Sequence, residues 1–413
     1  MEKRWNRVYL FLLMNSVFMS LLFYTSISTF FMQSKGLNLT QIFALESVLA
    51  IVLFLCDIPA SIWADQINRK IVLIIGNGLA VAGAFTMALA SDYWHFILSF
   101  TFDGISIAML SGVQSAYVYD ELVKSGRDQD ATRIYSRFHI ATTLAALVAP
   151  IMGSYIASTK MDYALPIWIS AFALTIGWVF TFFLPSQFPA KPDEVQEGES
   201  MTATGWKILK KSAIHIWKTP SLIFFALSGP AVWVISNSIH YLNQILFKRL
   251  DVAVTYFGLI MAIATLISLL GSWGAEYSQK KLGSIRSILL CSVLLAGSFF
   301  AMVWIHNVVL LTIAIGILLG SVALRAPIMS SASNALVPSE IRATTLSLLT
   351  LIGTLFTVLL NPAIGYVSDL NLNYALILCG VTILVLTFAY YPKLRKIGLG
   401  EERESEESKV ESA

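Results

Sequence analysis

Charge is scarce in this sequence. Only 13% of its 413 residues are charged and 56% are hydrophobic, whereas soluble domains average roughly 25% and 45–50%. A soluble chain of this length would need more charged side chains to cover its surface. The hydrophobic residues also occur in runs of about 20, the length of a helix that crosses a hydrocarbon core about 30 Å thick. The composition excludes an ordinary soluble protein and predicts an all-α integral membrane protein.

Cysteine is also rare, and the sequence signatures of enzymes are absent. The three cysteines, Cys56, Cys291 and Cys379, lie far apart inside hydrophobic runs, so we expect small core residues and no disulfide framework. There is no His-x-x-x-His pair, no close pair of catalytic acids and no glycine-rich phosphate loop. No cleavable signal peptide is expected, because the first hydrophobic run is too long. We therefore expect no enzyme activity, no metal and no cofactor.

Twelve hydrophobic segments are long enough to span a bilayer, six before a polar stretch and six after it. They cover residues 8–31, 41–63, 71–90, 95–118, 136–158, 163–184, 221–247, 253–275, 287–304, 309–333, 343–368 and 373–391. The expected organisation is an N-terminal six-helix bundle (1–185), a cytoplasmic central loop (186–220), a C-terminal six-helix bundle (221–392) and an acidic cytoplasmic tail (393–413).

Basic residues are unevenly distributed about these segments. Residues 401–413 contain six Glu against Arg403 and Lys409, so the rest of the chain carries a net charge of +7 (26 basic minus 19 acidic). This excess lies in short loops, which indicates membrane topology rather than nucleic-acid binding. With both termini in the cytoplasm, the opposite face has only four basic residues, as the positive-inside rule requires. They are Lys35, Lys160, Lys248 and Arg249.

The central loop contains one amphipathic segment. Residues 206–217 place Trp206, Leu209, Ala213, Ile216 and Trp217 on one helical face, with Lys207 and Lys211 pointing away from it. This pattern is typical of a helix that lies on the inner leaflet of a membrane. A membrane-surface linker is the preferred interpretation, and a regulatory docking site is the alternative.

The two halves of the chain repeat each other. Asp65-Gln-Ile-Asn-Arg-Lys70 returns 211 residues later as Glu276-Tyr-Ser-Gln-Lys-Lys281, with the acid and the basic pair in the same places. The same offset relates Asp162-Tyr-Ala-Leu165 to Asn373-Tyr-Ala-Leu376, and a nearly equal one relates Pro150-x-x-Gly153 to Pro362-x-x-Gly365. A duplicated half in a membrane chain is the usual architecture of a transporter.

These features resemble the major facilitator superfamily of secondary transporters. The stretch Ser61-Ile-Trp-Ala-Asp-Gln-Ile-Asn-Arg-Lys70 matches the acid and terminal basic pair of the family signature between spans 2 and 3, but lacks both glycines and the first arginine. Asn68, which replaces a glycine, tolerates left-handed backbone. Cys56-Asp-Ile-Pro59, Ala116-Tyr-Val-Tyr-Asp120 and Pro338-Ser-Glu-Ile-Arg-Ala-Thr344 resemble a branch of bacterial drug and metabolite permeases. The resemblance implies twelve helices in two pseudo-symmetric bundles.

The charged turn predicts a cytoplasmic latch. Asp65 lies at a helix end, where a carboxylate can accept backbone N–H groups of a facing helix. Arg69 and Lys70 can pair with Asp120 at the inner end of span 4. Such pairs would hold the cytoplasmic side closed and break when the halves rock apart. The alternative is that these charges only set topology.

Ionisable residues inside the membrane are costly and therefore mark candidate functional sites. Asp103 is the first candidate for proton coupling, because it shares a helical face with other polar residues. Glu46 is the second, and Asp57, two residues before a proline, is the third. Desolvation and renewed access to water could make the proton occupancy of such a carboxyl follow conformation.

Polar stripes mark four spans that the resemblance assigns to a central substrate cavity, namely spans 1, 4, 7 and 10. The candidate cavity residues are Asn15, Ser26, Gln114, Tyr117, Trp233, Asn237, His240, Tyr241, Gln244 and Arg325. Hydrogen bonds between packed helices would explain the same residues without a cavity. Arg325 would bind an anionic group or pair with a carboxylate.

The predicted function is proton-coupled export of an amphipathic small molecule by alternating access, by a monomer in a bacterial inner membrane. Uptake of a small polar or anionic solute and a transporter-like sensor are the alternatives. The expected partners are the substrate, protons and the lipid bilayer. Many proton-coupled exporters of the superfamily carry an arginine in span 4, where this chain has Ser111-Gly112, so the direction of transport stays open.

Overall fold

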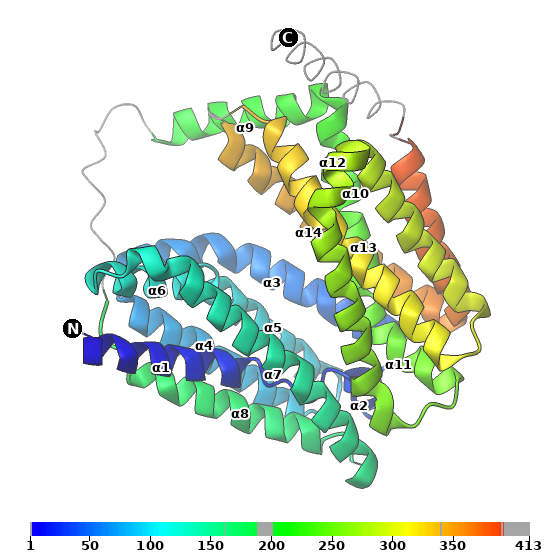
Figure 1. Cartoon of the computed structure of the whole chain (residues 1–413), viewed down its shortest axis with the longest axis horizontal. Coiled ribbons are helices and arrows are strands. Elements are labelled where there is room, and N and C mark those ends of the chain that lie inside the picture. The colour runs from blue at the N-terminus through cyan, green and yellow to red at the C-terminus, as the bar shows by residue number, and fades with distance from the viewer. Residues whose placement is uncertain (1, 161, 188–200, 339–340, 390, 392–413) are drawn as a thin grey trace. The chain divides into compact units, whose positions relative to one another are not determined.

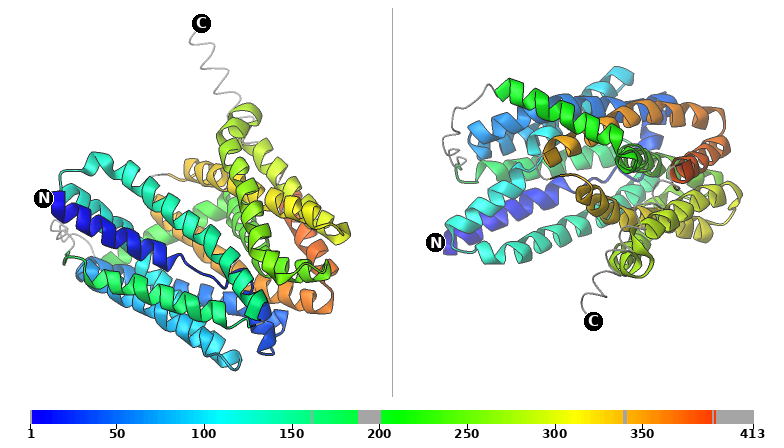
Figure 2. Two further views of the ribbon diagram at one scale, coloured as in Figure 1. Left: turned by 60° about the horizontal axis from the view of Figure 1, so that its bottom comes forward. Right: turned by 90° about the horizontal axis from the view of Figure 1, so that it is seen from above.

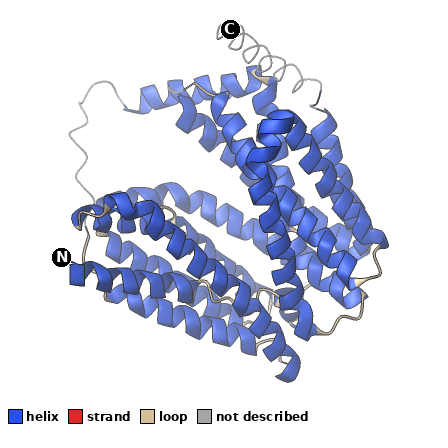
Figure 3. Cartoon of the chain, in the orientation of Figure 1, coloured by secondary structure: helices blue, strands red, loops and turns tan. Residues whose placement is uncertain are grey.

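The computed structural model describes residues 2–160, 162–187, 201–338, 341–389 and 391. Within these ranges every regular element is helical (Figure 3). Ten of the described helical segments are long and apolar enough to cross a membrane, judged by length and composition. The sequence-based expectation of an all-α membrane protein is thus confirmed, while the count of twelve crossings is not.

The chain divides into two compact units. The first comprises Met1–Glu194 and His240–Ala262. Its helices, labelled in Figure 1, are α1 (Glu2–Met19), α2 (Ser28–Ser34), α3 (Leu39–Gln66), α4 (Arg69–Ala88), α5 (Tyr93–Leu110), α6 (Val113–Lys124), α7 (Ala131–Lys160), α8 (Leu165–Phe182) and α11 (Ile239–Arg249), with short 3-10 helices η1 (Asp128–Asp130) and η2 (Val254–Tyr256).

Helices α3, α4 and α5 pack together in the first unit. Helix α5 packs against both α3 and α4, and α4 also packs against α8. Helices α1 and α8 run side by side (Figure 2). The hydrophobic core of this unit includes Trp5, Leu12, Leu73, Met109 and Leu122, which come from α1, α4, α5 and α6. This packing holds the polar side chains of α3 and α5 close together.

The second unit comprises Val195–Ile239 and Ile263–Ala413. It contains α9 (Met201–Lys218), α10 (Pro220–Asn237), most of α12 (Phe257–Trp304), α13 (Val308–Ala335), α14 (Arg342–Leu370) and a further helix at Leu372–Ala389. Helix α10 packs against α13 and α14. One buried cluster joins Phe224 and Phe225 of α10 to Ile288 of α12 and to Ile328 and Met329 of α13.

Three expected spans are broken helices. The first, expected at 8–31, is divided into α1 and α2 by an irregular segment in which the backbone N–H of Phe23 donates to Ser170 Oγ at 2.9 Å. The fourth is divided between α5 and α6 at Gly112, whose φ of 73° lies in the left-handed region that favours glycine. The seventh is divided between α10 and α11 near Ser238. Hydropathy averaged over a whole span does not detect these breaks, because a span such as Tyr93–Lys124 stays apolar overall despite the polar residues at its break.

The two expected spans 253–275 and 287–304 both lie within the residues labelled α12, Phe257–Trp304. The backbone leaves the helical conformation at Gly283, where φ is 77° and ψ is 161°. The label α12 therefore covers two helices that meet at Gly283, between the two expected spans.

The polar stretch between the two sets of spans contains the expected helix. Helix α9 covers the predicted segment 206–217 and packs against α10 and α14. Ile216 is buried with Leu222, Val337 and Ile341, whereas Trp217 is 79% exposed. The tail at 393–413 and most of the acidic part of the central loop lie outside the described residues.

Candidate functional site

Two half-buried carboxyl groups lie near each other in the first unit. Glu46 belongs to α3 and Asp103 to α5, and their carboxyls are close enough to interact electrostatically. Tyr24, in the irregular segment between α1 and α2, interacts with both. The hydroxyl of Tyr241 in α11 donates a hydrogen bond to Glu46. We call Tyr24, Glu46, Asp103 and Tyr241 the acidic cluster.

Asp103 is positioned by close packing of α5 on α4. Ser99, one turn earlier in α5, donates its hydroxyl to the carbonyl of Gly83 at 2.8 Å. A Cβ placed on Gly83 would lie 2.6 Å from Asp103 Oδ1, so the glycine provides the space for the carboxyl. Among the described residues, no group donates a hydrogen bond to Asp103. The carboxyl is half-buried, and it lacks the hydrogen-bond donors that would stabilise its ionised form.

Helix α11 is tied to α2 by a fully buried glutamine. Gln244 Oε1 accepts the backbone N–H groups of Thr29 at 2.9 Å and Phe30 at 3.3 Å. These amides belong to the first turn of α2, whose N-cap residue Ile27 provides no side-chain cap. Gln244 thus supplies from α11 the acceptor that this helix end lacks. Separating α11 from α2 would leave both amides without that acceptor.

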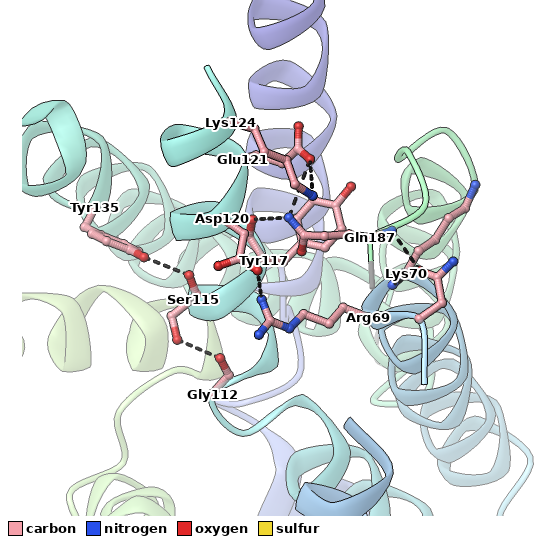
Figure 4. Close-up of polar contacts among 11 residues, drawn as sticks. Arg69, Lys70, Gly112, Ser115, Tyr117, Asp120, Glu121, Lys124, Tyr135 and Gln187 are labelled. Atoms are coloured by element: carbon pink, nitrogen blue, oxygen red, sulfur yellow. Dashed lines mark hydrogen bonds and ion pairs between the residues drawn. The ribbon is translucent and has the colours of Figure 1, made fainter. Parts of the chain in front are cut away.

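The charged turn predicted between spans 2 and 3 forms part of the ion-pair cluster shown in Figure 4. Arg69, at the start of α4, points toward Asp120 in α6, and the two side chains form an ion pair. Lys70 does not join them, because its Nζ donates to the carbonyl of Phe182 at 2.7 Å. Both members of the pair belong to the first unit. The pair stabilises that unit, and its action as a latch between the two halves stays a prediction.

The interpretation of Asn68 was wrong. Its φ is −56°, so the residue does not adopt left-handed backbone. It is the N-cap of α4 instead, and its Oδ1 accepts the backbone N–H groups of Lys70 and Gln187, each at 3.0 Å. Asn is preferred at this place because its short side chain reaches the free amides of the helix end. The side chain of Asp65 lies outside the described part of the structure.

Sequence reasoning missed the residues that complete this cluster. Gln187 Nε2 donates to the carbonyl of Tyr117 at 3.2 Å and approaches Glu121 Oε1 at 3.5 Å. Glu121 is only 2% exposed and also pairs with Lys124 at 3.7 Å. A second acid directly after Asp120, at the end of an apolar span, was a detectable signal in the sequence. Nothing in the sequence indicated the role of Gln187, because its partners Tyr117 and Glu121 are 70 and 66 residues away in the chain.

Several predicted cavity residues form hydrogen bonds that join segments of the first unit. Asn15 donates to the carbonyl of Gly177 at 2.9 Å, and Ser26 donates to that of Pro150 at 2.9 Å. Gln114 donates to Ser16 at 2.6 Å. Tyr117 is fully buried and donates to the carbonyl of Pro185 at 2.7 Å.

Other predicted residues are open to their surroundings. Trp233, Asn237 and His240 lie on or beside the break between α10 and α11, and all three side chains are exposed. Asp57 is exposed in α3 and forms no ion pair or hydrogen bond with the described residues. Its position is unlike that of Glu46 and Asp103, which are half-buried.

Arg325 is the predicted basic residue of the second unit. It is 5% exposed, and its Nη2 donates to Ser228 Oγ at 2.6 Å. No aspartate or glutamate pairs with it in the part of the chain that the structure describes. The repeated charged turn in α12 is different, because Glu276 and Lys280 form a pair at 2.5 Å on the surface. No cluster of metal-ligating side chains occurs among the described residues.

Comparison with known proteins identifies a transporter family. The family model for the Major Facilitator Superfamily matches residues 8–323. An uncharacterized transporter of Buchnera aphidicola subsp. Acyrthosiphon pisum is 27% identical over 130 residues, 31% of this chain and 32% of that protein. The multidrug resistance protein MdtH of Edwardsiella ictaluri is 26% identical over 115 residues, 28% of either chain. The matches thus span about a third or less of these curated relatives.

Solved structures are similar over nearly the whole chain. The crystal structure of nucleoside transporter NupG superposes with a TM-score of 0.72 and 17% identity, covering 93% of this chain and 98% of that one. That of peptide transporter POT in complex with sulfate has a TM-score of 0.67 and 16% identity, covering 94% of each. At these identities the likeness shows the fold alone.

Proposed function

This chain belongs to the Major Facilitator Superfamily, and from that premise we propose that it is a proton-coupled secondary transporter of an amphipathic small molecule. It would work by alternating access between two six-helix bundles. Membership in the family supports transport rather than catalysis. The coupling ion, the substrate class and the direction of transport are our proposals.

The ten observed candidate segments are compatible with twelve crossings if α1 and α2 together count as one further crossing and α12 counts as two. Helices α1 and α2 together would form the first crossing. The two stretches of α12 on either side of Gly283 would form the eighth and ninth. Broken helices are common in transporters, where irregular backbone lines a cavity or absorbs movement. The exposed residues Trp233, Asn237 and His240 lie at one such break and would line the substrate path.

The acidic cluster carries the proposal of proton coupling. Glu46 and Asp103 are half-buried and interact with each other. Burial and like charge both oppose a second negative charge in one place, so the two carboxyls together favour retaining a proton. Entry of water or movement of α11 would change that preference. Proton occupancy and conformation would then be linked.

Tyr241 would connect the protonation of Glu46 to movement of α11. Its hydroxyl donates to Glu46, and the same helix carries Gln244, which caps α2. A charged carboxylate is a stronger acceptor than a neutral carboxyl. Protonation of Glu46 would therefore weaken its bond to Tyr241 and favour release of α11 from α3. Because α11 continues α10 of the other unit, such a release would allow α10 to move.

Export is the proposed direction, and it is supported by the similarity to a multidrug resistance protein. We place the protein as a monomer in the inner membrane of a bacterium, with both termini in the cytoplasm. The ion pair of Arg69 with Asp120 would then lie on the cytoplasmic side, as part of the proposed latch with Asp65. Lys70 would contribute to that side through its bond to the Phe182 carbonyl rather than through Asp120.

Proteoliposomes containing the purified full-length protein test the proposal. The probes are naphthalene-1-sulfonate and (1-naphthylmethyl)trimethylammonium, with a pH-sensitive dye trapped inside and protein-free liposomes as the blank. Export by proton antiport predicts probe accumulation when the lumen is acidic, together with a rise in lumenal pH. Proton symport predicts accumulation under the opposite gradient. A protonophore should abolish either.

Isosteric variants identify the coupling residue. Asp103→Asn and Glu46→Gln should reduce gradient-driven accumulation at least tenfold but preserve exchange of labelled for unlabelled probe, because exchange needs no net proton movement. Asp57→Asn, which alters an exposed and unpaired carboxyl, should retain both activities. The proposal fails if accumulation is independent of the pH gradient and Asp103→Asn transports at the wild-type rate.

A further inference from the structure

Arg325 is a buried cation in the apolar interior of the second unit. It lies in α13, one residue from Leu324 and three from Ile328, both of which belong to the same hydrophobic cluster. Cys291 of α12 is near enough to interact with it electrostatically. Helices α10, α12 and α13 therefore surround the guanidinium.

The guanidinium has far fewer partners than donors. Nη2 donates to Ser228 Oγ at 2.6 Å and approaches the Ser228 carbonyl at 3.4 Å. Nε is buried and has no acceptor among the described residues. An arginine carries five N–H donors in a planar fork that suits two oxygens of an anion. The Nε–H of this fork is unused among the described residues.

A role in packing alone does not explain this arrangement. Burying a charge without a counter-charge is much more costly than burying an apolar side chain of the same size. A hydrogen bond to one serine of α10 could be made by a neutral side chain. A buried cation with an unused donor indicates that an anion occupies the place during some part of the working cycle.

We propose that Arg325, with Ser228, binds the anionic group of the transported molecule. The ligand class is an organic anion with one carboxylate, sulfonate or phosphate group and an apolar body. The apolar body would contact the hydrophobic side chains next to the site, such as Phe225 and Met329. This inference rests on the proposed transport function and narrows the amphipathic substrate to an anion.

Equilibrium binding to the purified full-length protein, with no pH gradient, tests the inference. The probes are again naphthalene-1-sulfonate and (1-naphthylmethyl)trimethylammonium, which share an aromatic body and differ in charge. The wild type should bind the anion at least tenfold more tightly than the cation. Arg325→Gln should remove that preference. Arg325→Lys should retain part of it, because the charge persists but the planar fork is lost.

Two controls keep the result interpretable. Arg286→Gln removes an exposed arginine of the same unit and should leave both affinities unchanged. Ser228→Ala retains the charge of Arg325 and should weaken anion binding less than Arg325→Gln does. Size-exclusion profiles of all variants show whether they fold, and if Arg325→Gln does not, Arg325→Lys and Ser228→Ala carry the test.

Equal binding of the two probes to the wild type would overturn the inference, as would an equal effect of Arg325→Gln on both. A carboxylate of the chain itself is the other source of negative charge. In that case Arg325→Gln would lower the unfolding temperature, a second change of Glu46→Gln or Asp103→Asn would restore it, and no anion would bind. That outcome also overturns the inference. Intact anion-selective binding without gradient-driven transport would instead contradict only the proposed proton coupling.

Discussion

The side-chain oxygen of Gln244 accepts the backbone N–H of Thr29 at 2.9 Å, although 215 residues separate them in the chain. The glutamine is fully buried and provides the helix cap that α2 lacks. The Nε2 of the same side chain donates to the carbonyl of Thr25 at 3.3 Å, so Gln244 also helps to hold the irregular segment between α1 and α2.

Gln244→Ala should lower the free energy of unfolding by about 1–3 kcal/mol, the usual cost of leaving buried polar groups without partners. Thermal and chemical unfolding in detergent measures the change. Gln33→Ala, at the other end of α2, removes a half-exposed glutamine and should have little effect. Equal stability of the two variants would contradict the capping role of Gln244.

Asp120→Asn should destabilise the first unit, because Arg69 would lose its charged partner. The side chains of Arg69 and Asp120 are 15% and 31% exposed, so we expect a loss of about 1–3 kcal/mol. The charge swap of Arg69→Asp with Asp120→Arg should recover part of it, as a double-mutant cycle would show. An exposed ion pair of the second half, between Glu276 and Lys280, provides the control. Glu276→Gln breaks a pair at the surface and should leave the unfolding curve unchanged.

Acid should loosen the start of α5 only well below neutral pH. The hydrogen bond from the His95 ring lowers the pKa of the Asp92 carboxyl, which also caps the amides of Trp94 and His95. Because the folded pKa is depressed, the stabilising effect is present above the unfolded value of about 3.9 and is lost as the pH falls through the folded value. The protection of the Trp94 amide against hydrogen exchange, relative to the exchange rate of an unfolded chain at the same pH, should therefore fall only below about pH 4.

Asp92→Asn serves as a control for the pH dependence of transport. The variant should retain the wild-type pH profile between pH 5 and 8, because Asp92 stays ionised throughout that range. A changed profile would mean that the pH response does not come from the acidic cluster alone.

Gly153→Ala should destabilise the protein although alanine favours helices. A Cβ at this position would collide with the backbone carbonyl of Phe23, so α7 would have to move away from the segment before α2. Gly297→Ala is the matched control, since nothing lies within 4 Å of the added Cβ. There the change should be neutral or stabilising by up to about 1 kcal/mol. The unfolding temperature should fall for Gly153→Ala and should stay the same or rise for Gly297→Ala.

The broad features of the fold were predictable because they depend on local properties of the chain. Hydrophobic runs, the amphipathic pattern at 206–217 and the expected turn near Gly283 all correspond to described elements. The pairing of Arg69 with Asp120 was also predictable, because the two charges lie at the ends of neighbouring hydrophobic segments. The hydrogen bond of Lys70 to the Phe182 carbonyl, in place of the predicted pair with Asp120, was not predictable, since it depends on where α8 ends.

The candidate site was predictable as a set of residue types but not as a set of contacts. Glu46, Asp103, Tyr241 and Arg325 were selected because charged and polar groups inside a membrane are costly, and that cost can be read from the chain alone. Their division into different roles depends on partners far away in the sequence. Tyr241 meets Glu46 across 195 residues and Arg325 meets Ser228 across 97.

The amino-acid sequence is enough to predict that this protein lies in a lipid bilayer, that it is helical, and which residues are costly to bury. These properties follow from the composition and order of neighbouring residues. Tertiary structure alone decided which helices break, which acid has a donor, and which cation is left without a counter-charge. The physical reason is that hydropathy acts locally along the chain, whereas a hydrogen bond between helices exists only after packing has brought its two groups together.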